Sequence, residues 1–84
     1  MEIKLEIPDY DETGFKFHWE DGFEIEVKES QGAIIISANK VGLISLAVQL
    51  LTLAQDTVPT PDHFHLDEYN GLEEGSKELI IAKV

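Results

Sequence analysis

The feature that most constrains the fold of this 84-residue chain is its longest periodic segment, residues 40–56, which predicts one amphipathic helix. Asn39 is a favourable N-cap residue directly before this segment. At 1.5 Å per residue the helix would be roughly 25 Å long. Its polar residues fall within about 60° of one another on a helical wheel and are Ser45, Gln49, Thr52 and Asp56.

Apolar residues occupy more than half of the circumference of this predicted helix. The side opposite the polar stripe comprises Leu43, Ile44, Leu46, Ala47, Leu50, Leu51 and Ala54, and Val41, Val48 and Leu53 widen the arc. A helix that packs on one sheet face needs an apolar arc of only about 100° or somewhat more. We therefore expect a loop folded over the helix to cover the surplus, with a second subunit or a partner protein as the alternatives.

Alternation of apolar and polar residues predicts strands on both sides of the helix. Residues 1–7, 15–19 and 23–27 alternate, whereas the run Ala33 to Ile36 does not, which is typical of a central strand or one covered on both faces. Two further strands are predicted at His63 to Asp67 and Lys77 to Lys83. The fold class expected is α+β: an antiparallel or mixed sheet of about six strands with one helix packed on one face, order ββββαββ, in a single domain over residues 1–84.

The turn at Glu20-Asp21-Gly22 is expected to join two of these strands through a three-residue loop, with Gly22 as its left-handed residue. This loop pairs Trp19 with Phe23 on the core face, and it places His18 opposite Glu24 on the outer face. Gly32 marks the next turn.

Charge and composition exclude several classes of function. Seventeen acidic residues stand against six basic ones, all lysine, for a formal net charge of −11, and there is no cysteine. A nucleic-acid or anionic-membrane partner is therefore not expected, and a favoured partner should be basic or neutral. Without cysteine, disulfides and thiolate metal sites are excluded. The N-terminal residues do not form a signal peptide, and we expect a cytoplasmic protein.

Two segments contain residue types that could bind a metal. Asp9, Asp11, Gly14 and Glu20 match part of an EF-hand loop, but strands flank the segment where that loop requires helices, so an acidic turn is expected. His63, His65 and Asp67 lie on one side of a predicted strand and would suit zinc or iron, with an exposed polar stripe as the simpler interpretation.

No nucleophile motif, tuned acid/base pair or glycine-rich phosphate loop is evident in the sequence. We expect a protein that is not an enzyme and that has no cofactor and no bound metal.

Three separated motifs resemble a known family. They are Asn39-Lys40-Val41-Gly42-Leu43 at the start of the apolar helix, His63-Phe64-His65-Leu66-Asp67, and Leu72-Glu73-Glu74-Gly75-Ser76 before the last strand. In this order they are similar to small bacterial immunity proteins of polymorphic toxin systems, the group catalogued as type 32. The resemblance covers residues 39–83 and implies a non-catalytic protein that binds and neutralises a cognate toxin domain made by the same cell.

An acidic inhibitor suits a basic toxin domain through steering and charge complementarity. Two surfaces are candidates for the contact: the outer stripe of His18, Glu20, Glu24 and Glu26, and the segment of His63, His65, Asp67, Glu68 and Tyr69. The alternative function is a homo-oligomeric or accessory interaction module that uses the surplus apolar surface of the helix around Val41, Val48 and Leu53, with a possible homodimer through the helix.

Overall fold

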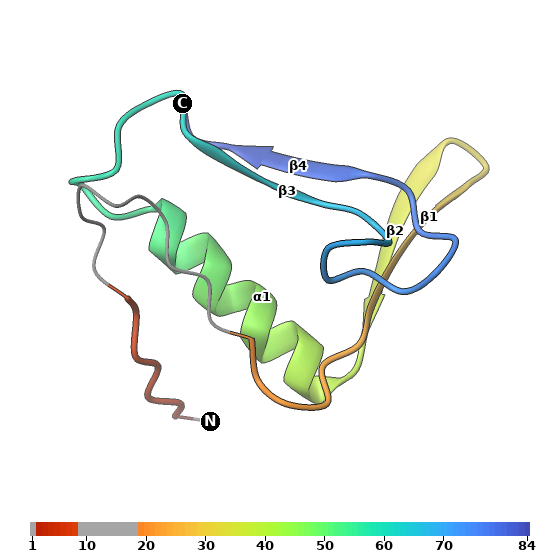
Figure 1. The fold of residues 1–84 in the computed structure, drawn as a ribbon, viewed down its shortest axis with the longest axis horizontal. Coiled ribbons are helices and arrows are strands. Elements are labelled where there is room, and N and C mark those ends of the chain that lie inside the picture. Colours follow the sequence, from red (N-terminus) through yellow and green to blue (C-terminus); the bar gives the residue numbers. More distant parts are fainter. Residues whose placement is uncertain (1, 9–18) are drawn as a thin grey trace.

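A computed structural model describes residues 2–8 and 19–84 and shows an α+β fold with two hairpins and one helix (Figure 1). The elements are β1 (Ile25–Ser30), β2 (Ala33–Ala38), α1 (Lys40–Leu53), β3 (His63–Leu66) and β4 (Leu79–Ala82). β1 pairs with β2 and β3 pairs with β4, both antiparallel, in two separate two-stranded sheets. The α+β class is confirmed, but the expected six-stranded sheet is wrong: the described residues contain four strands in the order ββαββ.

The differences arise in the N-terminal third of the chain. Residues 2–8 form no strand, and residues 15–18 of the predicted Phe15 to Trp19 strand lie outside the described residues. β1 begins at Ile25 and pairs with β2. Its turn explains the choice of neighbour, because Gln31 (φ 51°) and Gly32 (φ 82°) form a two-residue loop of the type that favours tight hairpins.

The predicted contact between Trp19 and Phe23 is present without a strand ladder around it. Their rings stack with centroids 4.8 Å apart and planes inclined by 21°. Gly22 lies between them with φ 83°, the left-handed conformation expected at that position. The amide of Phe23 donates to the carbonyl of Glu20 at 3.3 Å, so the segment is a turn.

α1 begins as predicted. The side-chain oxygen of Asn39 accepts a hydrogen bond from the amide of Gly42 at 2.7 Å, and Asn39 also binds the chain before β1: its Nδ2 donates to the carbonyl of Gly22 at 2.9 Å. Gly42 lets the first turn approach β1, because a Cβ at this position would collide with the carbonyl oxygen of Glu24. The helix ends at Leu53, three residues before the predicted end at 56.

The buried side of α1 is the polar side, which reverses the orientation expected from the wheel. Ser45, Gln49 and Thr52 are at most 1% exposed, whereas Leu43, Leu50 and Leu51 are 42–55% exposed. The buried hydroxyls are satisfied: Ser45 Oγ accepts from the amide of Glu20 at 3.0 Å, and Thr52 Oγ1 donates to the carbonyl of Val48 at 2.7 Å. A helix that is apolar over more than half its circumference can turn either side inward, and the contact at Gly42 selects this one.

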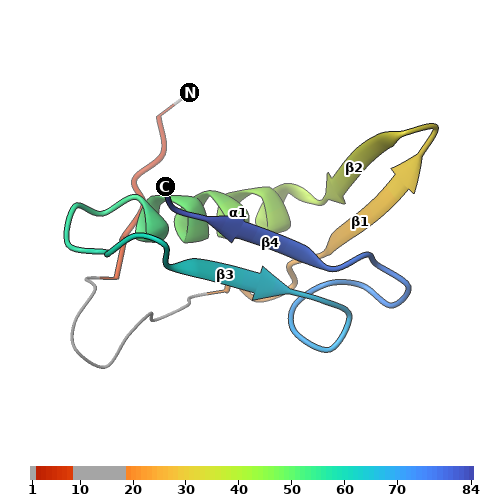
Figure 2. The same cartoon turned by 90° about the horizontal axis from the view of Figure 1, so that it is seen from above.

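The core lies between α1, β1 and the inner face of the β3–β4 hairpin, which crosses above the helix (Figures 1 and 2). Its buried members are Ile25, Val27, Leu53, Val58, Phe64, Leu66 and Leu72. Lys83 fixes the end of β4 over the helix, because its Nζ donates to the carbonyls of Gln55 at 2.6 Å and Val58 at 2.9 Å.

The connection between β3 and β4, residues 67–78, covers the edge of β1 that β2 leaves free. The amides of Glu73 and Lys77 donate to the carbonyls of Ile25 and Val27, each at 2.8 Å. Ser76 Oγ accepts from the amide of Val27 at 3.2 Å. Backbone groups on both edges of β1 are therefore engaged.

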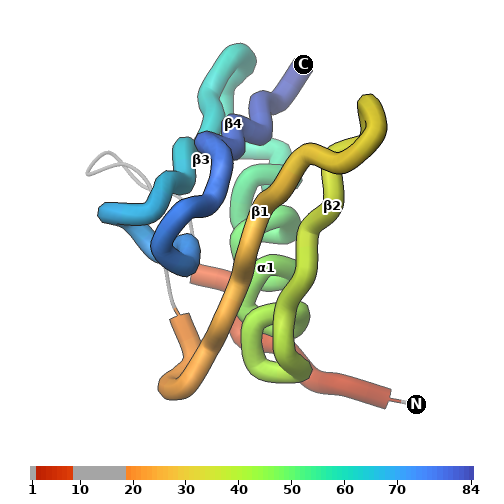
Figure 3. The backbone as a smooth tube through the Cα atoms, turned by 90° about the vertical axis from the view of Figure 1, so that its right-hand side faces the viewer, coloured from red at the N-terminus to blue at the C-terminus, as the bar shows by residue number. Residues whose placement is uncertain are grey.

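β2 is exposed on both faces, which corrects the prediction of a covered central strand. Ile34, Ile35 and Ile36 are 57%, 46% and 39% exposed. The position of β2 in the fold explains this exposure. One edge of β2 pairs with β1, and after Ala38 the chain enters α1, which runs away from β2 beneath β3 and β4. The β1–β2 hairpin therefore projects past the rest of the fold (Figure 3).

The N-terminal segment covers one side of the helix. Gln55 Nε2 donates to the carbonyl of Pro8 at 2.8 Å, and residues 4–8 line a hollow with Val48. The face of α1 that carries Leu43, Leu50 and Leu51 stays exposed. The covering segment expected from the sequence therefore reaches only part of the apolar surface that the helix does not bury in the core.

Candidate protein-binding surface

Two of the predicted contact residues meet in an acidic hollow on the outer face of β1. Glu24 and Glu26 line this hollow of about 290 Å³ together with Glu73 from the β3–β4 connection. Its remaining lining residues are Ile25, Ser37, Ala38 and Asn39. Asn39 positions Glu24, because its Oδ1 accepts from the Glu24 amide and its own amide donates to the Glu24 carbonyl, both at 3.1 Å. Three carboxylates around one recess attract a cationic side chain.

The structure does not place Glu20 with this group. Its amide donates to Ser45 Oγ on the helix, and Glu20 lines hollows with Lys4 and Leu5 of the N-terminal segment. His18, the remaining member of the predicted outer stripe, lies outside the described residues. Glu73, in contrast, was missed by sequence reasoning, because local patterns do not show that a long connection docks on β1.

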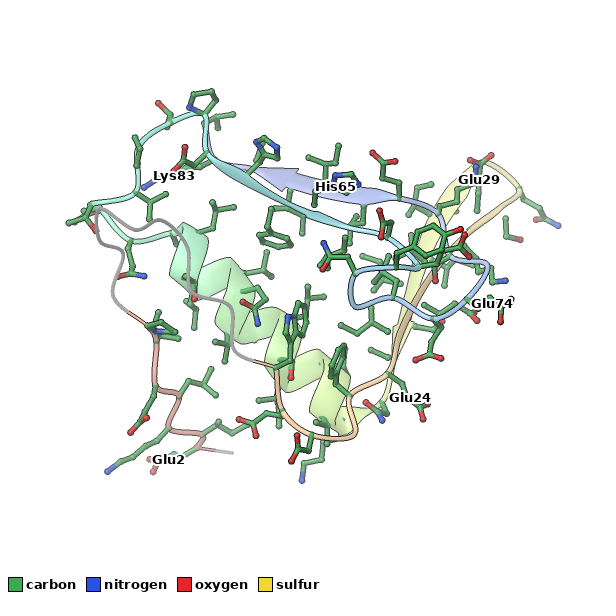
Figure 4. The ribbon with its side chains drawn as sticks, in the orientation of Figure 1. Glu2, Glu24, Glu29, His65, Glu74 and Lys83 are labelled. Atoms are coloured by element: carbon green, nitrogen blue, oxygen red, sulfur yellow. The ribbon has the colours of Figure 1, made fainter. Side chains whose placement is uncertain are left out.

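The histidines lie on the exposed face of β3, as their spacing predicts, while Phe64 and Leu66 point to the core. His65 Nε2 is 3.2 Å from Oε1 of Glu78, the residue directly before β4, and 3.8 Å from Asp67 Oδ2. Figure 4 shows the His65 ring on the outer side of the hairpin. Within residues 2–8 and 19–84, no group of three or more His, Cys, Asp or Glu residues is arranged to hold a metal ion.

The acids after β3 shape the chain around an exposed aromatic residue. Asp67 Oδ1 accepts from the amide of Tyr69, and Glu68 Oε2 accepts from the amide of Gly75, both at 2.9 Å. Tyr69 itself is 90% exposed. Aromatic side chains held on ordered turns are frequent anchors of protein interfaces.

Two exposed apolar surfaces lie outside the residues expected to contact a toxin, although an apolar helix surface was expected for the alternative, self-associating function. One is the isoleucine run of β2 and the other is the leucine face of α1. The sequence carried a signal for the isoleucine run: no charged residue occurs between Gln31 and Asn39, although the segment before it is rich in acidic residues. Contiguous exposed apolar residues with a polar surround are typical of protein interaction sites.

The described residues thus form an α+β structure whose surface combines exposed apolar side chains with acidic ones, an arrangement suited to binding another protein. The family model Imm32, described as Immunity protein 32, matches residues 33–84, and the chain belongs to this family. The matched region includes β2, α1, β3 and β4. Membership implies binding to a cognate toxin, and immunity proteins are generally not catalysts.

No curated protein and no solved structure matches the chain. Among the residues that the structure describes, no helix has the length and apolar character needed to cross a bilayer.

Proposed function

We propose that this protein, a single α+β domain over residues 1–84, neutralises a bacterial toxin domain in the cytoplasm by binding it and without catalysis. The observation that carries the proposal is the Imm32 match over β2, α1, β3 and β4, the elements that supply most of the exposed apolar residues. The toxin is basic, because the net charge of −11 favours a cationic partner and disfavours nucleic acid or an anionic membrane.

The contact surface is proposed to include the residues expected from the sequence: His18, Glu20, Glu24, Glu26, His63, His65, Asp67, Glu68 and Tyr69. Glu73 is added by its position beside Glu24 and Glu26. These acids would form the polar rim of an interface whose apolar centre comes from exposed isoleucine or leucine side chains.

The test is co-expression with the product of the adjacent upstream reading frame, followed by growth assays and size-exclusion chromatography. We expect relief of toxicity and a complex that weakens as salt rises, because screening reduces attraction between exposed charges. Replacing Glu24, Glu26 and Glu73 with Gln should weaken the complex. The matched control replaces the exposed residues Glu2, Glu6 and Asp56 with their amides, which removes the same charge elsewhere. Absence of both complex and rescue for the unaltered protein would disprove the proposal.

A second candidate is a homodimer through the helix. The apolar surface expected around Val41, Val48 and Leu53 is wrong in its residues, because Val48 and Leu53 are 3% and 5% exposed. Leu43, Leu50 and Leu51 form the exposed apolar face of α1 instead, and Lys40 is the only charged residue of that helix. Two copies can therefore approach through this face with little direct charge repulsion. This candidate uses a surface different from the acidic hollow, so the two functions are compatible with one molecule.

A further inference from the structure

β2 has a free edge with a defined set of backbone groups. One edge of β2 pairs with β1, and no described strand pairs with the other. The two-residue loop at Gln31 and Gly32 is closed by the pair Ser30 and Ala33, which hydrogen-bond to each other in hairpins of this type. By the alternation of an antiparallel ladder, residues 33, 35 and 37 direct their amides and carbonyls to β1. Ile34 and Ile36 direct theirs to the free edge.

The side chains at this edge continue the core outward. Ile36 lies opposite Val27 and Ile34 opposite Glu29, on the sheet face where Ile25 and Val27 are buried. Ile35 points to the other face. β2 also lacks the lysines, prolines and bulges with which proteins discourage strand addition at an edge. It is therefore competent to accept one more strand.

The acidic hollow adjoins this edge and selects what can add to it. Ser37 of β2 lines the hollow with Glu24, Glu26 and Glu73, and all but Glu73 lie on the outer face of the hairpin. The serine side chain is small, so a long side chain on an added strand opposite Ser37 would pass over it toward Glu26, the residue that faces Ser37 on β1. A lysine or arginine is complementary to that recess.

We propose that an extended segment of the cognate toxin adds to the free edge of β2 as a further strand. Its apolar side chains pack on Ile34 and Ile36, and a basic side chain opposite Ser37 enters the acidic hollow on the side of Glu26. Because side chains alternate between faces, the residues opposite positions 34 to 37 of β2 are apolar, any residue, apolar and basic in turn, an order that an antiparallel segment carries in reverse in its own sequence. This inference rests on the proposed function.

Charge argues against a second copy of this chain at the same edge. Each copy carries −11, and no described residue of β2 could supply the cation that the hollow favours. Pairing two β2 strands would instead bring two acidic recesses close together, and like charges at an interface disfavour association.

The first test is amide hydrogen exchange on the protein alone and in complex with the co-expressed product of the adjacent reading frame. In the free protein the amides of Ile34 and Ile36 should exchange faster than that of Ile35. In the complex they should slow by roughly tenfold or more, as expected when an exposed amide becomes hydrogen-bonded at an interface. A complex in which both amides still exchange rapidly would overturn the inference and leave the proposed function standing.

The second test uses Ile36→Pro, which removes one outward amide and no hydrogen bond to β1. Binding should weaken by roughly tenfold or more, the scale of losing an interface hydrogen bond and its neighbouring contacts. Ile36→Val keeps the amide and is the control. Unchanged affinity of Ile36→Pro for the toxin would count against strand addition. Slow amide exchange at Ile34 and Ile36 in concentrated free protein would also count against it, because a second copy would then occupy the edge. If the unaltered protein forms no complex at all, the proposed function fails as well.

Discussion

At the scale of single residues, Gly42 decides how the helix meets the sheet. Its position in the first turn of α1 lets the helix lie against the backbone of Glu24, where a Cβ would collide with the carbonyl oxygen. Helix propensity by itself favours alanine over glycine by about 1 kcal/mol. Here the steric effect opposes that preference.

We therefore predict that Gly42→Ala lowers the free energy of unfolding by about 1 kcal/mol or more, measured by urea denaturation. Ala47→Gly, near the middle of the same helix, is the control and should cost about 1 kcal/mol through propensity alone. A Gly42→Ala protein more stable than the unaltered one would show that α1 does not approach β1 as closely as described.

Residue-level signals in the sequence were reliable where the interaction is local. Asn39 caps the helix within three residues, Gly22 and Gly32 adopt the left-handed conformation at turns, and Trp19 contacts Phe23 across a short loop. Glu73 shows the opposite case. Its place beside Glu24 and Glu26 depends on backbone hydrogen bonds between segments far apart in the chain, and no local pattern encodes them.

At the scale of elements, the positions of the helix and of most strands were easier to predict than which strands pair with each other. The helix and both C-terminal strands were located within a few residues, because each has its own periodicity. The strand that pairs with β1 was not predicted, because the segments before and after β1 are both apolar enough to pair with it. The face of α1 was also ambiguous, since its apolar arc exceeds half the circumference.

The orientation of α1 leads to a paired prediction. Leu53 is 5% exposed and belongs to the core, whereas Leu50, three residues earlier and at the border of the leucine face, is 42% exposed. Leu53→Ala should lower the free energy of unfolding by about 2–5 kcal/mol through the cavity it leaves. Leu50→Ala should cost less than about 1 kcal/mol. Denaturation of both variants under one condition checks this, and the reverse ranking would mean that the leucine face of α1 is the buried one.

At the scale of the whole molecule, long-range repulsion and apolar exposure act in opposite directions. A charge of −11 on each copy keeps molecules apart at low ionic strength, while the leucine face of α1 favours association once that repulsion is screened.

Light scattering over a range of salt and protein concentrations tests the homodimer. We expect monomers at low salt and a dimer population that grows as salt rises and that Leu50→Gln removes. Ile80→Gln, which alters an exposed apolar residue on β4, is the control and should leave the dimer intact. Monomers at every salt and protein concentration would exclude self-association through the helix.

The docking of residues 67–78 on β1 has a consequence for further strand pairing. A sheet with two open sides can grow without limit, as fibrils do, whereas this one is closed on the β1 side by the chain's own connection. Within the described part of the β1–β2 sheet, only the outer edge of β2 remains open to a further strand. This sheet can therefore be extended on one side only, so strand pairing there cannot continue in both directions as it does in a fibril.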